Sequence, residues 1–211
     1  MIIHDETLTR TSNVSKIEKF KDRMPWNVCD FTEEELQSLD FGSWFDQKYE
    51  PILTLEKALG FAKEYHLFLN IEIKNISNTF ADERVVQIII DMIKNTQTEH
   101  LVLLSSFYHP YLPLCKKHSL KIPTAALQKD KQPNDLIHYL HALQVDAYHP
   151  ADRITDQTIV SLLREAGFFV NVYTVNNPQR QIELFKWGVN GIFTDILKRI
   201  EKLPEKVLDQ C

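Results

Sequence analysis

Apolar and polar residues alternate strictly over residues 68–74, which read Phe-Leu-Asn-Ile-Glu-Ile-Lys. This period of two predicts a β-strand whose successive side chains point to opposite faces of a sheet. The apolar side chains share one face, whereas Asn70, Glu72 and Lys74 share the other. If helices cover the sheet, the neighbouring carboxylate and ammonium indicate either a site that holds a cation and an anion, or an ordinary ion pair.

Strand-like and helix-like segments alternate along the rest of the chain. Apolar stripes at helical spacing predict helices that begin near Thr54, Asp82, His109, Pro133, Thr155 and Asn177, with Thr155 as one of the caps. Short apolar runs predict further strands at 101–107, 123–127, 145–148, 169–175 and 191–194. Residues 1–4 have the pattern of the second half of another strand. This alternation predicts parallel pairing through right-handed crossovers, so we expect an α/β fold.

The segment of about 12–51 does not follow this alternation. It is irregular and rich in aromatic and charged residues, with one helical turn expected over 32–39, where Thr32 and Glu35 form a capping box. Large apolar side chains in a segment without a long periodic element are typical of a small insertion packed over a scaffold. We therefore expect an insertion rather than a linker.

Polar residues gather at the ends of the predicted strands. They are His4 and Asp5, Glu72 and Lys74, Ser105 and Ser106, Gln128, His149, Thr174 and Asn176, and Thr194 and Asp195. Functional residues shared among the carboxyl ends of successive strands are typical of the (β/α)8 TIM barrel. That fold usually takes about 250 residues. With 211 residues, we predict a single barrel domain, 1–211, that is incomplete at its N-terminus.

Composition excludes several classes of function. A formal net charge of -5 argues against a nucleic-acid partner, because such a surface repels phosphate. Three cysteines without paired spacing indicate a reduced compartment rather than a disulfide framework. No segment has the apolar length of a transmembrane span, and the sequence does not open on a signal-peptide pattern. We therefore expect a cytoplasmic chain.

Several motifs occur in a fixed order along the chain. They are His4-Asp5-x-x-Leu8-x-Arg10-Thr11, Leu39-Asp40-x-Gly42-Ser43-Trp44-Phe45, Leu53-Thr54-Leu55-Glu56, Asn70-Ile71-Glu72-Ile73-Lys74, Ser105-Ser106-Phe107, Val172-Tyr173-Thr174-Val175-Asn176 and Gly188-Val189-Asn190-Gly191-Ile192-Phe193-Thr194-Asp195. As an ordered series they resemble the glycerophosphodiester phosphodiesterase family over essentially the whole chain. The resemblance implies a (β/α)8 barrel with a small insertion after the His-Asp strand. It also implies hydrolysis of glycerophosphodiesters to glycerol 3-phosphate and an alcohol, with a divalent cation and two histidines.

The same resemblance suggests a role for four residues. His4 is expected to be the second of the two catalytic histidines, since imidazole suits proton transfer near neutral pH. Glu72 is expected to bind the divalent cation, Mg²⁺ or Ca²⁺, and Lys74 to contact the phosphate. Tyr173 is expected to line the substrate pocket, where the family often carries an aromatic residue. A core tyrosine is the alternative at that position.

The sequence also departs from the family pattern. Members of the family carry a His-Arg-Gly motif and a Glu-x-Asp motif upstream of the His-Asp strand, and this sequence contains neither there. We therefore expect reduced activity, because loss of an acid or base group alone removes about 10²–10⁴-fold in rate. A non-catalytic module that binds a phosphate ligand or a partner is the alternative. A homo-oligomer in which two chains complete each other's barrel is compatible with the same pattern.

Overall fold

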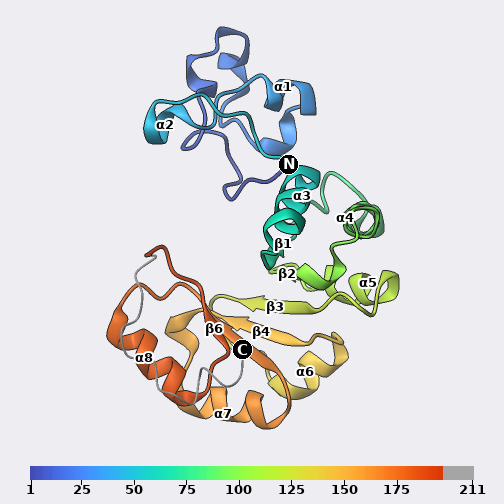
Figure 1. Cartoon of the computed structure of the whole chain (residues 1–211), viewed down its shortest axis with the longest axis vertical. Coiled ribbons are helices and arrows are strands. Elements are labelled where there is room, and N and C mark those ends of the chain that lie inside the picture. Colours follow the sequence, from blue (N-terminus) through green and yellow to red (C-terminus); the bar gives the residue numbers. More distant parts are fainter. Residues whose placement is uncertain (197–211) are drawn as a thin grey trace.

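A computed structural model of the chain describes residues 1–196. Its sheet has six parallel strands in chain order, each hydrogen-bonded to the next. The strands are β1 (Leu69–Glu72), β2 (Val102–Ser106), β3 (Thr124–Gln128), β4 (Ala147–Pro150), β5 (Phe169–Val172) and β6 (Gly191–Ile192). The sheet curls into part of a barrel, so the predicted incomplete (β/α)8 fold is confirmed (Figure 1).

Helices alternate with the strands and lie on the outer side of the curled sheet (Figure 1). They are α3 (Leu55–Tyr65), α4 (Asp82–Thr96), α5 (Tyr111–His118), α6 (Leu136–Ala142), α7 (Gln157–Glu165) and α8 (Pro178–Trp187). Buried apolar residues between helices and strands form two core clusters, one around α3 to α5 and one around α6 to α8. The side of the sheet away from these clusters is called the inner wall of the barrel.

Local sequence explains where most helices begin and end. Asn177 caps α8 by accepting backbone hydrogen bonds from its first turn, Pro178 occupies the first helical position, and Gly188 ends the helix with a left-handed φ of 96°. The prediction that Thr155 caps α7 is wrong. Asp156 is the cap, with its carboxylate 2.8 Å from the Ile159 amide, because the Thr155 hydroxyl donates instead to the carbonyl of Ala151.

The segment before α3 is irregular and has its own small core. It contains α1 (Glu33–Gln37), α2 (Ser43–Asp46) and three 3-10 turns at Val14–Lys16, Glu18–Arg23 and Val28–Asp30. The capping box of Thr32 and Glu35 is present at the start of α1. Its buried residues, from Leu8 to Ile52, form a cluster distinct from the two under the sheet. Figure 1 shows this segment, in blue, set off at one end of the molecule.

The expected strand at residues 1–4 is absent from the structure. The Ile2 amide donates to the Leu53 carbonyl and Ile3 packs against the small N-terminal core, but residues 1–4 form no ladder with another strand that the structure describes. Because a strand is defined by a ladder of hydrogen bonds to a neighbour, the apolar pattern of these residues does not make one here. The described residues therefore contain six strands of the sheet instead of the seven predicted.

Candidate functional site

The inner wall carries two charged side chains at the carboxyl end of β1. Leu69, Ile71 and Ile73 pack into the cluster beneath the helices. Because side chains alternate across a strand, Glu72 and Lys74 point to the opposite side, as the sequence pattern predicts. Neither is buried in the core: the exposed fractions of the two side chains are 23% and 37%.

Glu72 and Lys74 contact each other directly. The Lys74 Nζ lies 2.7 Å from Oε1 of Glu72. Such a partly exposed pair contributes little to stability, typically about 0–1 kcal/mol, so the contact alone does not explain the placement of two charges on this wall. The arrangement leaves an ammonium and a carboxylate accessible at the mouth of the barrel.

Strand β2 holds the backbone between these two residues. The Ile73 amide donates to the Ser105 carbonyl at 2.7 Å, and the Ile73 carbonyl accepts from the Ser106 hydroxyl at 2.7 Å. Ser106 is fully buried, so solvent does not compete for its hydroxyl. Strand β2 therefore holds Ile73 through both its amide and its carbonyl. These two hydrogen bonds position the backbone from which the Glu72 and Lys74 side chains extend.

Tyr173 follows β5 and faces the same inner wall. Its hydroxyl donates to the carbonyl of Gln128 at 2.8 Å, and its ring meets that of Phe107 edge to face at a centroid distance of 5.8 Å. Burial raises the pKa of Tyr173 to about 12, and the charges of Asp130 and Glu72 act in the same direction. The phenol is thus a neutral donor at any working pH, and it lies within electrostatic reach of Glu72.

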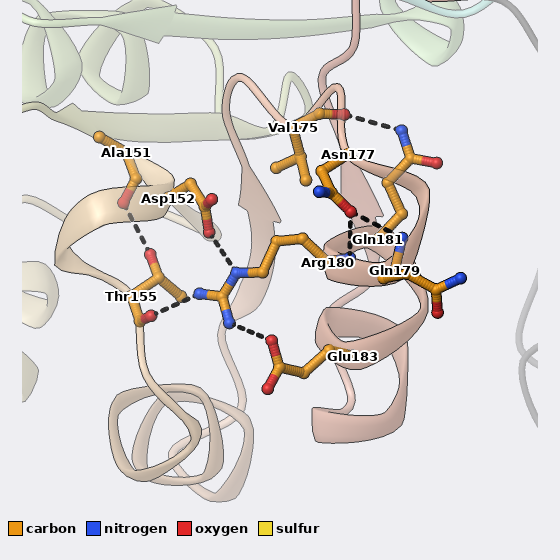
Figure 2. A network of polar contacts seen from close by, with 9 residues as sticks. All are labelled: Ala151, Asp152, Thr155, Val175, Asn177, Gln179, Arg180, Gln181 and Glu183. Atoms are coloured by element: carbon orange, nitrogen blue, oxygen red, sulfur yellow. Dashed lines mark hydrogen bonds and ion pairs between the residues drawn. The ribbon is translucent and has the colours of Figure 1, made fainter.

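Helix α8 anchors the loop that follows Tyr173. The Gln181 side-chain amide donates to the Val175 carbonyl at 2.7 Å, and Asn177 caps the helix directly after this loop. Arg180 extends across to the neighbouring connection, where it donates to Asp152 at 2.7 Å and to the Thr155 carbonyl at 2.9 Å (Figure 2). The loop after Tyr173 is therefore held by α8, which Arg180 in turn joins to the connection before α7.

His4 lies in the segment before the small N-terminal core, and its side chain is 80% exposed. Its Nδ1 is 2.9 Å from Oδ1 of Asp5, and Asp5 in turn accepts two hydrogen bonds from Arg10. Within residues 1–196, no hydrogen bond or ion pair joins His4 to Glu72 or Lys74. The structure brings Glu72, Lys74 and Tyr173 to one wall, and it places His4 in a separate carboxylate-bound setting.

The donors at this wall do not fit a complete divalent-cation site. No group of three or more His, Cys, Asp or Glu side chains in the described part of the chain is placed to hold a metal ion. Mg²⁺ and Ca²⁺ take six or more oxygen ligands, several of them from protein or substrate. Glu72 supplies one carboxylate, and Lys74 already binds it. Glu72 is thus at most one ligand among others.

Sequence analysis assigned no role to three residues that the structure makes candidates, which are Asp5, Arg10 and His149. Asp5 and Arg10 belong to the motif that begins with His4. The available sequence signal was an acidic residue adjacent to this histidine and a positively charged residue shortly after it. His149 lies in β4, directly before its last residue, and is 1% exposed, and its Nδ1 has no hydrogen-bond partner among the described residues. Burial lowers the pKa of His149 to about 4. Its position at the end of a predicted strand was the available sequence signal, but that position does not predict burial.

Two open hollows on the surface contain none of the predicted site residues. The first, of about 550 Å³, lies between α1 and the start of α3 and includes Glu33 and Lys57. The second, of about 820 Å³, lies along α8 and includes Arg180 and Trp187. The chemistry at the inner wall is a stronger guide to function than the shape of these shallow hollows.

None of the helices within residues 1–196 combines the length and apolar character needed to cross a membrane.

Comparison with known proteins gives consistent results. The sequence model described as "Glycerophosphoryl diester phosphodiesterase family" matches residues 1–198. A glycerophosphodiester phosphodiesterase of Bacillus altitudinis is 30% identical over 213 residues, which cover 98% of this chain and 81% of that protein. A second protein of that name, from Caldanaerobacter subterraneus, is 30% identical over 98% of this chain and 80% of its own length.

Solved structures share the fold. An Oleispira antarctica phosphodiesterase, in complex with the product sn-glycerol-3-phosphate, has a TM-score of 0.78 at 24% identity, over 99% of this chain and 77% of that one. A structure from Silicibacter pomeroyi has a TM-score of 0.81 at 18% identity, over 99% of this chain and 78% of that one. At these identities the two structures support the fold alone.

Proposed function

Since this chain belongs to the glycerophosphoryl diester phosphodiesterase family, whose members are phosphoric diester hydrolases, we propose that it acts on glycerophosphodiesters and releases glycerol 3-phosphate and an alcohol. The observation that carries the proposal is the placement of Glu72 and Lys74 on the inner wall, where their Oε1 and Nζ lie 2.7 Å apart, partly exposed and within electrostatic reach of Tyr173. The product named for the Oleispira antarctica structure supports the choice of substrate class.

Each residue has a chemical role in this proposal. Lys74 binds a non-bridging oxygen of the phosphodiester, where an ammonium offsets the negative charge that develops during attack. Tyr173 and Phe107 line the pocket beside the phosphate. His4 transfers a proton, either from the attacking hydroxyl or to the leaving alkoxide. A single histidine can carry out only one of these two proton transfers. We therefore expect turnover well below that of an enzyme with two catalytic histidines.

We also propose that a divalent cation, Mg²⁺ or Ca²⁺, takes part, with Glu72 as the ligand from this wall. The described residues do not complete its coordination shell. Phosphate binding and proton transfer are therefore assigned to side chains of this chain and not to the cation.

A phosphate-binding module without turnover is the second candidate. It is favoured by the separate settings of His4 and the Glu72–Lys74 pair in the described structure. Lys74 can bind a phosphate without His4, since an ammonium needs no proton transfer to hold an anion.

Release of glycerol 3-phosphate from glycerophosphocholine tests the proposal. The purified chain is assayed with Mg²⁺, with Ca²⁺ and with EDTA, and binding of glycerol 3-phosphate is measured by calorimetry. We expect slow, cation-dependent release that K74Q removes. Binding without release favours the module, and the absence of both contradicts the proposed function. The exposed K117Q, which alters an ion pair with Glu83 on the outer layer, is the matched control.

The cellular setting is a further proposal. Cys29 and Cys115 are free thiols in the structure, which fits the reduced compartment expected from the sequence. We propose a cytoplasmic location, to be tested by fractionation of cells that express the tagged chain. A homo-oligomer is proposed as well, and light scattering of the purified protein measures it.

A further inference from the structure

The carboxylate of Asp5 is engaged on both oxygens. Its Oδ2 accepts from Arg10 Nε at 2.6 Å, while its Oδ1 accepts from Arg10 Nη2 at 3.0 Å and faces His4 Nδ1 at 2.9 Å. A carboxylate can only accept hydrogen bonds, so the Nδ1 of His4 must be the donor. The neutral imidazole then carries its lone pair on Nε2, the nitrogen that points away from Asp5.

Asp5 remains ionised under all working conditions. Hydrogen bonds from Arg10 and then from His4 hold the pKa of Asp5 well below its usual range. The side chain is 23% exposed, so it is partly shielded from competing water. The acceptor that orients His4 is therefore a permanent one.

The irregular N-terminal segment holds Arg10 in turn. The Arg10 guanidinium lies 5.9 Å from the ring centre of Trp44, on α2, within the range of a cation–π contact. The Trp44 indole donates to the Phe41 carbonyl at 2.8 Å, and Asp40 accepts from the first amides of α2. Hydrogen bonds to neighbouring residues thus hold Trp44 in position next to Arg10.

We propose that Asp5 is a positioning residue that sets the tautomer of His4, and that Arg10 and Trp44 hold Asp5 in the required place. The proposal rests on the proposed function, in which His4 transfers a proton through Nε2. With Nδ1 donating to Asp5, Nε2 accepts a proton as the base, and the carboxylate stabilises the imidazolium that results. The insertion thereby contributes to the chemistry through Trp44, far from Glu72 in the sequence.

Ring nitrogen NMR of the full chain tests the assignment. In ¹⁵N-labelled protein, at a pH where the imidazole is neutral, long-range ¹H–¹⁵N spectra report which nitrogen of His4 carries the proton. We expect Nδ1 in the unmodified chain and a shift of the proton towards Nε2 in D5N, because the new side-chain amide donates to Nδ1. R10Q and W44L should give intermediate populations. The backbone amide spectrum shows whether each variant is folded.

The chain offers a matched control for this experiment. His118 and Glu83 form another histidine–carboxylate contact, 2.9 Å between Nε2 and Oε1, on the outer layer. E83Q should change the spectrum of His118 and leave the tautomer of His4 as it was. The same His4 tautomer in D5N and in the unmodified chain would overturn the proposal.

Kinetics separate this proposal from the proposed function. We expect D5N to lower kcat for glycerophosphocholine by roughly 10²-fold or more with KM nearly unchanged, since a positioning residue acts on the reacting state rather than on binding. A chain without any turnover contradicts the proposed function, and the tautomer of His4 then decides the role of Asp5 by itself. Equal losses in kcat and in substrate binding would contradict a positioning role.

Discussion

The Nε2 of His149 lies 2.9 Å from the side-chain amide nitrogen of Asn171, across the pair of strands β4 and β5 on the inner wall. An amide nitrogen only donates, so Nε2 is the acceptor and the imidazole is neutral. The ring of Phe193 packs against it at a centroid distance of 5.2 Å. An uncharged histidine is therefore built into the barrel wall, and its protonation works against folding.

This relationship predicts a loss of stability in mild acid. The unfolded chain protonates His149 near pH 6.5, whereas burial lowers the pKa in the folded chain to about 4. Between these values the unfolded state binds the extra proton, so the free energy of unfolding falls as the pH decreases from about 6.5 towards about 4. At pH 5, this difference in the pKa of His149 lowers the free energy of unfolding by about 2 kcal/mol. Burial also lowers the pKa of His109, which adds to the effect.

Urea unfolding at pH 7 and pH 5 measures this loss. We expect H149L to lose less stability between the two pH values than the unmodified chain, although its stability at pH 7 is lower. H66N is the control, because His66 ends α3 with a left-handed φ of 53° that Asn tolerates. An equal pH dependence in H149L and the unmodified chain would contradict the prediction.

Replacement of Glu72 separates its two proposed roles. Without added cation, we expect E72Q to bind glycerol 3-phosphate more tightly by roughly 2- to 5-fold, because a carboxylate that pairs with Lys74 and repels phosphate is gone. With Mg²⁺ or Ca²⁺ present, the unmodified chain should gain affinity and E72Q should not. Calorimetric titrations with and without the cation measure both effects. A cation response that is the same in the two proteins would exclude Glu72 as a ligand.

Tyr173 can be tested for its place in the pocket. Y173F loses the hydrogen bond to Gln128, but that carbonyl still accepts from the Ala151 amide at 2.8 Å. We therefore expect a stability loss of about 1 kcal/mol or less and unchanged binding of glycerol 3-phosphate. Y173A also removes the ring that contacts Phe107 and should weaken binding severalfold. If Y173A lowers only the free energy of unfolding, Tyr173 is a core residue rather than a pocket residue.

The amino end of β3 contains an ion pair that contributes to stability. Lys116 is 6% exposed and donates to the Asp146 carboxylate at 2.6 Å, and the Thr124 amide donates to the same oxygen at 2.7 Å. D146A leaves the Thr124 amide without this acceptor and leaves the buried Lys116 ammonium with the Ile122 carbonyl at 3.1 Å, which should cost about 1–3 kcal/mol of unfolding free energy. E18Q, at an exposed surface pair with Lys21, should change it by about 0.5 kcal/mol or less. Urea unfolding at pH 7 compares them, and equal losses would contradict the prediction.

Local sequence was a reliable guide to most helix starts, although it placed the cap of α7 one residue too early, at Thr155 instead of Asp156. The capping box of Thr32 and Glu35 and the Asn-Pro start of α8 depend on neighbouring backbone groups, and both are confirmed. The alternation around Glu72 likewise placed its side chain on the wall opposite the helices. The strand expected at 1–4 is wrong because a strand also needs a distant partner for its hydrogen bonds.

Periodicity and capping are local properties of the chain, so the α/β class, the succession of the six parallel strands and the faces of β1 could be predicted from the sequence. The tertiary structure was needed to show that the Tyr173 ring lies against Phe107, that the Tyr173 hydroxyl reaches the Gln128 carbonyl, and that the Arg10 guanidinium lies 5.9 Å from the Trp44 ring centre. These contacts join residues that lie far apart in the sequence. Their distances follow from how the whole chain packs, which no local pattern encodes.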